Sequence, residues 1–125
     1  MNVPEDRRYT DQHEWIKTTD AGVLVGITDY AQDALGDVVF VDLPDVGREV
    51  AAGDAIAEVE STKSVAEVYA PLAGTIGGVN AALADTPELI NSDPYEAGWF
   101  FLITPTDATE VEQMLDAAGY RALTE

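Results

Sequence analysis

Only two lysines occur in this chain of 125 residues, and one of them, Lys63, lies in the segment ESTKSVAEVYAP at residues 60–71. The chain has 24 acidic against 6 basic side chains. Lys63 therefore has an ordinary explanation, as a surface charge partner for Glu60 or Glu67. It also has a chemical explanation, because an enzyme can modify a lysine amine that is presented on a turn.

The residues around Lys63 favour the chemical explanation. Alternating apolar and polar residues before and after Ser61–Ser64 predict two strands, which places these four residues at a hairpin turn. A lysine at such a turn projects into solvent, and its small neighbours let an enzyme's cleft approach closely. A projecting lysine on a rigid β platform is what a swinging-arm carrier requires, since the protein supplies location and the attached cofactor supplies reactivity.

Catalysis by the chain itself has little support in the sequence. His13 is the only histidine and there is no cysteine, which excludes a His-rich or thiolate metal site and a cysteine nucleophile. Nucleophile-elbow, HExxH and P-loop motifs are absent. Paired carboxylates are frequent by composition alone and indicate nothing specific. We read His13-Glu14-Trp15 as a strand with a half-buried tryptophan and a hydrogen-bonded histidine, and expect a protein that is not an enzyme and binds no metal.

The charge of the chain excludes several kinds of partner. The formal net charge is −18, whereas nucleic acids and anionic membranes bind proteins largely through Lys and Arg. We expect neither partner. An N-terminal secretory signal and an apolar run of membrane-spanning length are both lacking, which predicts a cytoplasmic protein. The excess of carboxylates also suggests the hypothesis of a high-salt cytoplasm, where self-repulsion is screened.

The elements expected to position Lys63 are mostly short strands separated by Gly, Pro and Asp turns. They are predicted at 9–18, 22–28, 37–44, 48–60 (two strands), 65–71, 74–80 and 99–103. One short helix is predicted within DYAQDALGD (29–37), with Asp29 as its N-cap and Gly36 as its stop. An amphipathic helix is predicted over about 107–119, ending at Gly119. This pattern is typical of a single domain built as a small β-sandwich or barrel.

The order of several segments resembles the H proteins of the glycine cleavage system. The resemblance covers most of the chain and rests on YTDQHEW, VGITDYAQDALGDVVFVDLP, ESTKSVAEVYAP, GTIGGVN and LINSDPYEAGW. It implies a mainly β fold, a lipoyl/biotinyl-type barrel-sandwich hybrid of two small antiparallel sheets with a short internal helix and a C-terminal helix. Residues 1–125 would form one lipoyl-carrier domain with its core at about 23–104.

The resemblance also implies a cofactor and partners. (R)-Lipoate would be attached to Lys63 through an amide; related biotin carriers usually place Met on both sides of the lysine, where this chain has Thr62 and Ser64. The arm would carry the aminomethyl group from a glycine decarboxylase to an aminomethyltransferase and be reoxidised by dihydrolipoyl dehydrogenase. A lipoyl-attaching enzyme would be a further partner, and a monomer is expected.

Three residues are implied to line the surface against which the loaded arm rests. By position these are Gln12, Glu14 and Glu67. Relatives often have Asp at position 67 and a smaller polar residue at position 12. Carboxylates there would hold a cationic amine by charge-assisted hydrogen bonds. The competing interpretation is that Glu14 and Glu67 are ordinary solvated strand acids.

Two other functions remain open on the sequence. The chain could be a lipoyl domain of a 2-oxo-acid dehydrogenase, although those domains are shorter and usually lack the HEW segment and the terminal helix. It could also be an H-like protein that relays lipoyl groups to other proteins, or that binds partners without lipoate. The relay function would use the same Lys63.

Overall fold

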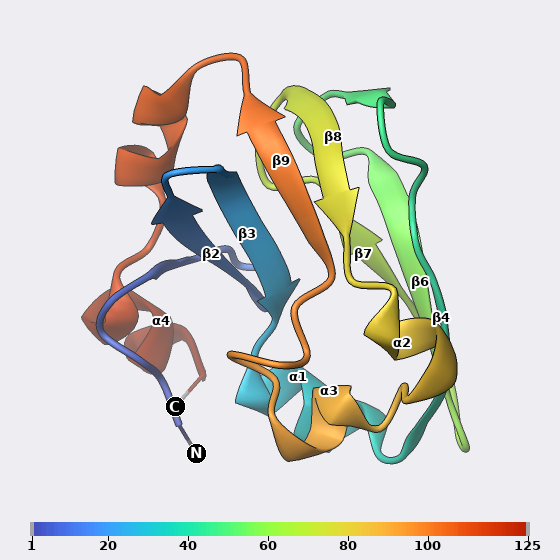
Figure 1. The fold of residues 1–125 in the computed structure, drawn as a ribbon. Helices are drawn as coiled ribbons and strands as arrows, with labels where there is room; N and C mark the ends of the chain where they lie inside the picture. Colours follow the sequence, from blue (N-terminus) through green and yellow to red (C-terminus); the bar gives the residue numbers. More distant parts are fainter. Residues whose placement is uncertain (1, 125) are drawn as a thin grey trace.

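The computed structural model describes residues 2–124, which form two antiparallel sheets with short helices around them (Figure 1). The six-stranded sheet has the order β1 (Arg8–Tyr9), β2 (Glu14–Thr19), β3 (Gly22–Ile27), β9 (Phe101–Pro105), β8 (Gly74–Val79) and β5 (Glu49–Val50). The three-stranded sheet has the order β4 (Val38–Asp42), β6 (Ala55–Ser61) and β7 (Val65–Tyr69). This arrangement confirms the predicted mainly β fold of two antiparallel sheets.

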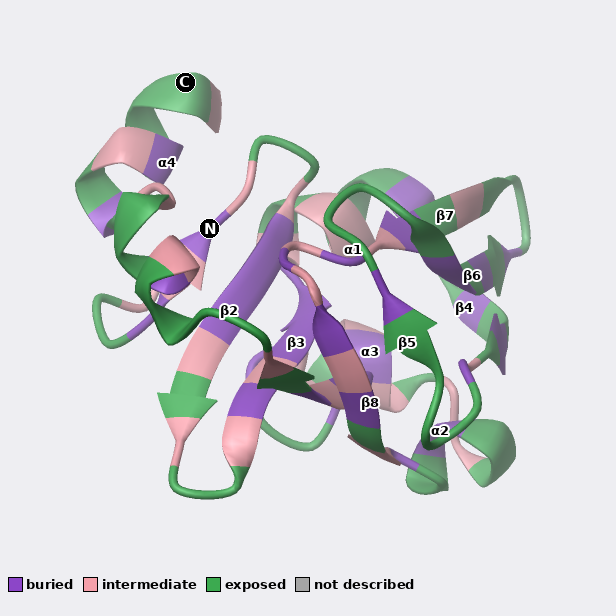
Figure 2. Ribbon diagram, turned by 90° about the horizontal axis from the view of Figure 1, so that it is seen from above, coloured by how far each residue is buried: buried purple, intermediate pink, exposed green. Residues whose placement is uncertain are grey.

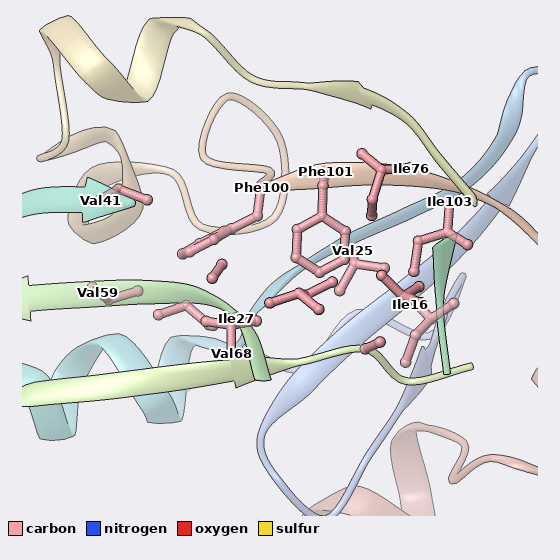
Figure 3. Close-up of a cluster of buried hydrophobic side chains, with 14 of the residues drawn as sticks. Ile16, Val25, Ile27, Val41, Val59, Val68, Ile76, Phe100, Phe101 and Ile103 are labelled. Atoms are coloured by element: carbon pink, nitrogen blue, oxygen red, sulfur yellow. The ribbon is translucent and has the colours of Figure 1, made fainter. Parts of the chain in front are cut away.

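The main core lies between these sheets and follows from the alternation of apolar residues along the strands. In β6, for example, Ala57 and Val59 are buried while Glu58 and Glu60 are exposed. Figure 3 shows Val41, Val59 and Val68 of the small sheet near Val25, Ile76, Phe101 and Ile103 of the large one. Burial of this set on one face of each sheet fixes the strand registers, because a slip by one residue would turn every side chain to the other face.

A second, smaller cluster packs at the edge of the large sheet that β1 and β2 form. It joins Tyr9, Trp15 and Tyr95 to Ala117 and Tyr120 of helix α4 (Ala117–Thr124). Gly26 lies directly opposite Trp15 in the sheet, and a Cβ on it would meet the indole at 2.6 Å. The indole therefore covers the glycine, and Trp15 is fully buried, not half-buried as predicted.

Helix α1 (Asp29–Leu35) occurs where predicted, but its N-cap is different. Thr28 caps it, with its hydroxyl accepting a hydrogen bond from the Ala31 N–H at 3.2 Å, while Asp29 lies in the first turn. The reason is that Thr28 has extended backbone and donates its own N–H to the His13 carbonyl, so the helix begins one residue after the sheet-like hydrogen bond. Gly36, at φ +82°, ends the helix as predicted.

The predicted helix over 107–119 is wrong in its boundaries. A 3-10 helix, η1 (Ala108–Gln113), comes first, the chain is then extended at Met114, and α4 follows with Gly119 inside it. The break occurs because Leu115 exchanges two backbone hydrogen bonds with Tyr9, at 2.8 and 3.0 Å. This long-range bridge overrides local helix propensity.

Two further helical turns were not predicted. They are α2 (Ala82–Asp85) and α3 (Leu89–Ser92), and the latter packs beside α1 (Figure 1). In the part of the chain that the structure describes, no helix is long and apolar enough to cross a membrane.

Candidate functional site

Lys63 lies in the turn that joins β6 to β7, and Ser61 holds this turn in shape. The buried Ser61 hydroxyl oxygen accepts hydrogen bonds from the Ser64 N–H at 3.0 Å and the Lys63 N–H at 3.3 Å. Ser61 in turn donates its backbone N–H to the Ser64 carbonyl at 2.8 Å. These bonds close a four-residue turn, so the backbone under the lysine is fixed while Thr62, Lys63 and Ser64 are exposed.

The environment of Lys63 differs from that of the other lysine. Lys17 lies 3.4 Å from a carboxylate oxygen of Asp6. Within residues 2–124, Lys63 has no carboxylate oxygen within the 4.0 Å that defines an ion pair. A surface charge partner, the ordinary explanation for Lys63, is therefore lacking among the described residues.

The lysine stem rests on the loop that ends α1. A Cβ on Gly36 would lie 3.1 Å from Lys63 Cε and 3.6 Å from its Nζ, so the missing side chain leaves a seat for the lysine. The neighbouring Thr62 N–H donates to the Asp37 carbonyl at 3.1 Å. Glycine is thus favoured at position 36 by its positive φ, and its lack of a side chain leaves room for the Lys63 stem.

Beside this hairpin, a hollow of about 300 Å³ opens between α1 and β7. Its walls are mainly apolar, with Ala31, Ala34 and Leu35 on the helix side and Ala66 and Val68 on the strand side. Ser64, the residue after the lysine, is at its edge. An apolar concave surface of this size at the base of a projecting lysine can hold an aliphatic chain and a small ring, so the residues fit a lipoyl group.

The three residues expected to face such an arm lie around this one hollow. Gln12, Glu14 and Glu67 all line it, from the turn before β2, from β2 and from β7. Gln12 and Glu67 are exposed, whereas Glu14 is only 2% exposed. The interpretation of Glu14 as a solvated strand acid is therefore wrong, while Glu67 has the exposure of one.

Both carboxylate oxygens of Glu14 have protein donors. The Tyr69 N–H donates to Oε2 at 2.7 Å and the Thr10 hydroxyl to Oε1 at 3.0 Å. Burial raises the pKa of Glu14 to about 7, against the opposing effect of these two hydrogen bonds. The group therefore changes its charge near neutral pH, at a place that borders the apolar hollow.

His13 also lines the hollow and belongs to a network that sequence reasoning missed. It lies in the turn before β2, with φ +67°, and not in a strand as predicted. Its Nδ1 is 2.8 Å from the Tyr120 hydroxyl, which is 2.7 Å from the hydroxyl of Thr28. The predicted hydrogen bond of His13 is confirmed, but its partner is 107 residues away, and no local sequence signal indicates it.

Comparison with known proteins covers the whole of this arrangement. A family model described as Glycine cleavage H-protein matches residues 7–125. Glycine cleavage system H proteins of Thermus thermophilus and Anaeromyxobacter sp. (strain K) are 55% and 51% identical, each over 100% of this chain and 98% of the relative. The crystal structure of a glycine cleavage system H protein from Mycobacterium marinum aligns with a TM-score of 0.90 and 47% identity, over 98% of both chains.

Proposed function

This chain belongs to the glycine cleavage H-protein family, and we propose that Lys63 is the residue that carries its lipoyl group. Members of this family are lipoyl shuttle proteins of the glycine cleavage system and not themselves enzymes. The full-length match also sets aside the shorter lipoyl domains of 2-oxo-acid dehydrogenases. One observation carries the assignment of Lys63: it is the lysine without an ion pair within residues 2–124, on a hydrogen-bonded turn beside an apolar hollow.

The residues around Lys63 have separable roles in this proposal. Ser61 fixes the turn, and Gly36 leaves room for the lysine stem. When attached, the lipoyl group supplies the redox-active disulfide on which an aminomethyl group is carried. The apolar residues of α1 and β7 exclude water from one side of the arm, which supports a resting place in the hollow.

We assign Gln12, Glu14 and Glu67 to the polar part of the same hollow. A carboxylate there pairs with a protonated amine by a charge-assisted hydrogen bond. Replacing Glu14 by Ala removes the most buried of these groups. The expected result is faster release of formaldehyde from the loaded carrier than from wild type, and an unchanged release rate would count against this role.

The partners follow from the family at two levels. The chain interacts with components of the glycine cleavage system. We propose that these are a glycine decarboxylase, an aminomethyltransferase and dihydrolipoyl dehydrogenase, with a lipoyl-attaching enzyme acting before them. We further propose a cytoplasmic monomer in which residues 1–125 form one carrier domain, with its core at about 23–104.

A pair of lysine variants tests the attachment site. A lipoate ligase with ATP and lipoate is applied to the wild type, to Lys63→Arg and to Lys17→Arg, and the products are analysed by intact mass. Modification of the wild type and of Lys17→Arg, but not of Lys63→Arg, is expected. Modification of Lys63→Arg would refute the assignment. A glycine–bicarbonate exchange assay with the modified wild type then separates glycine cleavage from a lipoyl relay, because only the former supports exchange.

A further inference from the structure

The side of the three-stranded sheet that faces away from the core has an unusual composition. Strand β4 contributes Phe40 and Asp42 to this outer face, β6 contributes Glu58 and Glu60, and β7 contributes Val65 and Glu67. All six side chains are exposed, and each of the three strands also has buried core residues, among them Val41, Val59 and Val68 (Figure 2). The outer face therefore combines four carboxylates with two large apolar groups.

Strand β4 has a local irregularity beside these apolar groups. The register of β4 with β6 shifts between Val38 and Phe40, which leaves Val39 and Phe40 both turned to solvent, 51% and 55% exposed. Such bulges often re-aim side chains beside functional sites. Phe40 lies opposite Glu60, and Glu60 lies opposite Val65, which is 56% exposed and two residues from Lys63. The apolar groups therefore adjoin the lysine hairpin.

Three of the carboxylates form a row across the strands, each directly opposite the next. Asp42 pairs with Glu58, and Glu58 pairs with Glu67, directly across the two ladders. Like charges directly opposite each other destabilise a sheet. These three carboxylates line a second, shallow hollow of about 180 Å³, and Arg48 lines it too. Within the described chain, however, Arg48 is not within ion-pair distance of any of the three. The described residues therefore supply no ion pair to this row of three carboxylates.

We propose that this outer face is the docking surface for the glycine decarboxylase that acts on the Lys63 arm, and that this enzyme presents basic side chains around an apolar socket. The proposal rests on the assignment of Lys63 as the attachment site. Basic groups of the partner neutralise the carboxylate row, and the apolar socket binds Phe40 and Val65. The resulting interface has an apolar centre and a charged rim, as is usual for protein–protein interfaces. A second copy of this chain does not fit, because a twofold contact would place the acidic row against itself.

The kinetic test uses glycine decarboxylase from the same organism in the glycine–bicarbonate exchange reaction, with the lipoylated carrier as varied substrate. Phe40→Ala is expected to raise the KM for the carrier about tenfold with little change in kcat. Val46→Ala is the matched control, since Val46 is 61% exposed on the loop between β4 and β5, outside the three strands of this sheet. A KM for Phe40→Ala within twofold of that of the control would overturn the proposal.

A charge variant separates docking from stability. Glu58→Gln removes the middle of the acidic row, so it is expected to raise the thermal unfolding midpoint while raising KM about threefold at low salt, an effect that fades as salt increases. Glu112→Gln, at an exposed acid in η1, is the control for net charge. A higher midpoint with an unchanged KM would show a repulsion without a docking role, and would overturn the proposal.

A competition experiment keeps this test distinct from that of the attachment site. The full-length Lys63→Arg chain is added as inhibitor of exchange supported by the lipoylated H protein of Thermus thermophilus. It is expected to inhibit, and about tenfold more weakly when it also has Phe40→Ala. Equal inhibition by both chains would refute the docking surface. A lipoyl adduct on the Lys63→Arg chain would instead refute the attachment site.

Discussion

The buried carboxyl of Glu14 makes the stability of this fold depend on pH, and Glu14→Gln removes that dependence. The protonated acid can satisfy both of its neighbours, with one oxygen accepting from the Tyr69 N–H and the hydroxyl donating to Thr10. A glutamine amide reproduces this arrangement, since its oxygen accepts and its N–H donates. The variant therefore mimics the neutral acid at every pH.

The magnitude follows from the shift of the Glu14 pKa from 4.5 to about 7. At acid pH, below the value for the unfolded chain, the carboxyl is neutral in both states and its contribution to stability is fully present. As pH rises, the unfolded chain ionises first, so the free energy of unfolding falls until the folded group also ionises near its raised pKa. The total loss is about 3 kcal/mol, of which about 2 kcal/mol falls between about pH 5.5 and about pH 8.5.

Urea unfolding of wild type and Glu14→Gln at these two pH values measures the effect. The free energy of unfolding of the variant, taken relative to that of the wild type, is expected to be about 2 kcal/mol larger at the higher pH than at the lower pH. Glu112→Gln, at an exposed acid, serves as control and should change stability by less than about 0.5 kcal/mol at either pH. A difference between wild type and Glu14→Gln that stays constant with pH would refute the reasoning.

Three further predictions concern the hairpin seat, the helix contact and the charge. Gly36→Ala should slow lipoylation of Lys63 several-fold more than Gly47→Ala. Both glycines have positive φ, but only at Gly36 would a Cβ lie against the lysine stem, at 3.1 Å. Equal lipoylation rates would contradict a role for Gly36 in making room for Lys63. Tyr120→Phe should lower the free energy of unfolding by about 1–3 kcal/mol in denaturant titrations, since it leaves His13 and a buried threonine hydroxyl without this partner; an unchanged midpoint would contradict it. The thermal midpoint should rise from low to molar KCl as self-repulsion is screened; a flat response would remove the high-salt hypothesis.

The strands and the lysine hairpin were predictable because their signals are local. Alternation on both sides of Ser61–Ser64 requires a turn there, and the structure has β6 and β7 with that turn between them. Gly36 ends α1 for an equally local reason, since few residues other than glycine adopt its backbone conformation.

What was missed depends on contacts between distant segments. Leu115 is drawn into a bridge with Tyr9, which divides the helix predicted at the C-terminal end. Glu14 reads as an ordinary strand acid until the Tyr69 N–H, 55 residues away, is placed against it. The partner of His13 comes from α4, across nearly the whole chain. No local pattern encodes such pairings, because they arise only when the two sheets and α4 pack together.

Peptide mass mapping of the protein purified from its native host tests the carrier assignment most directly. The two lysines fall in separate segments of the chain, so their adducts are distinguishable. A lipoyl adduct on Lys63, with Lys17 unmodified, is the predicted result. An unmodified Lys63 in a host that lipoylates its other carrier proteins would contradict the account, and residues 61–64 would then be an ordinary hairpin turn.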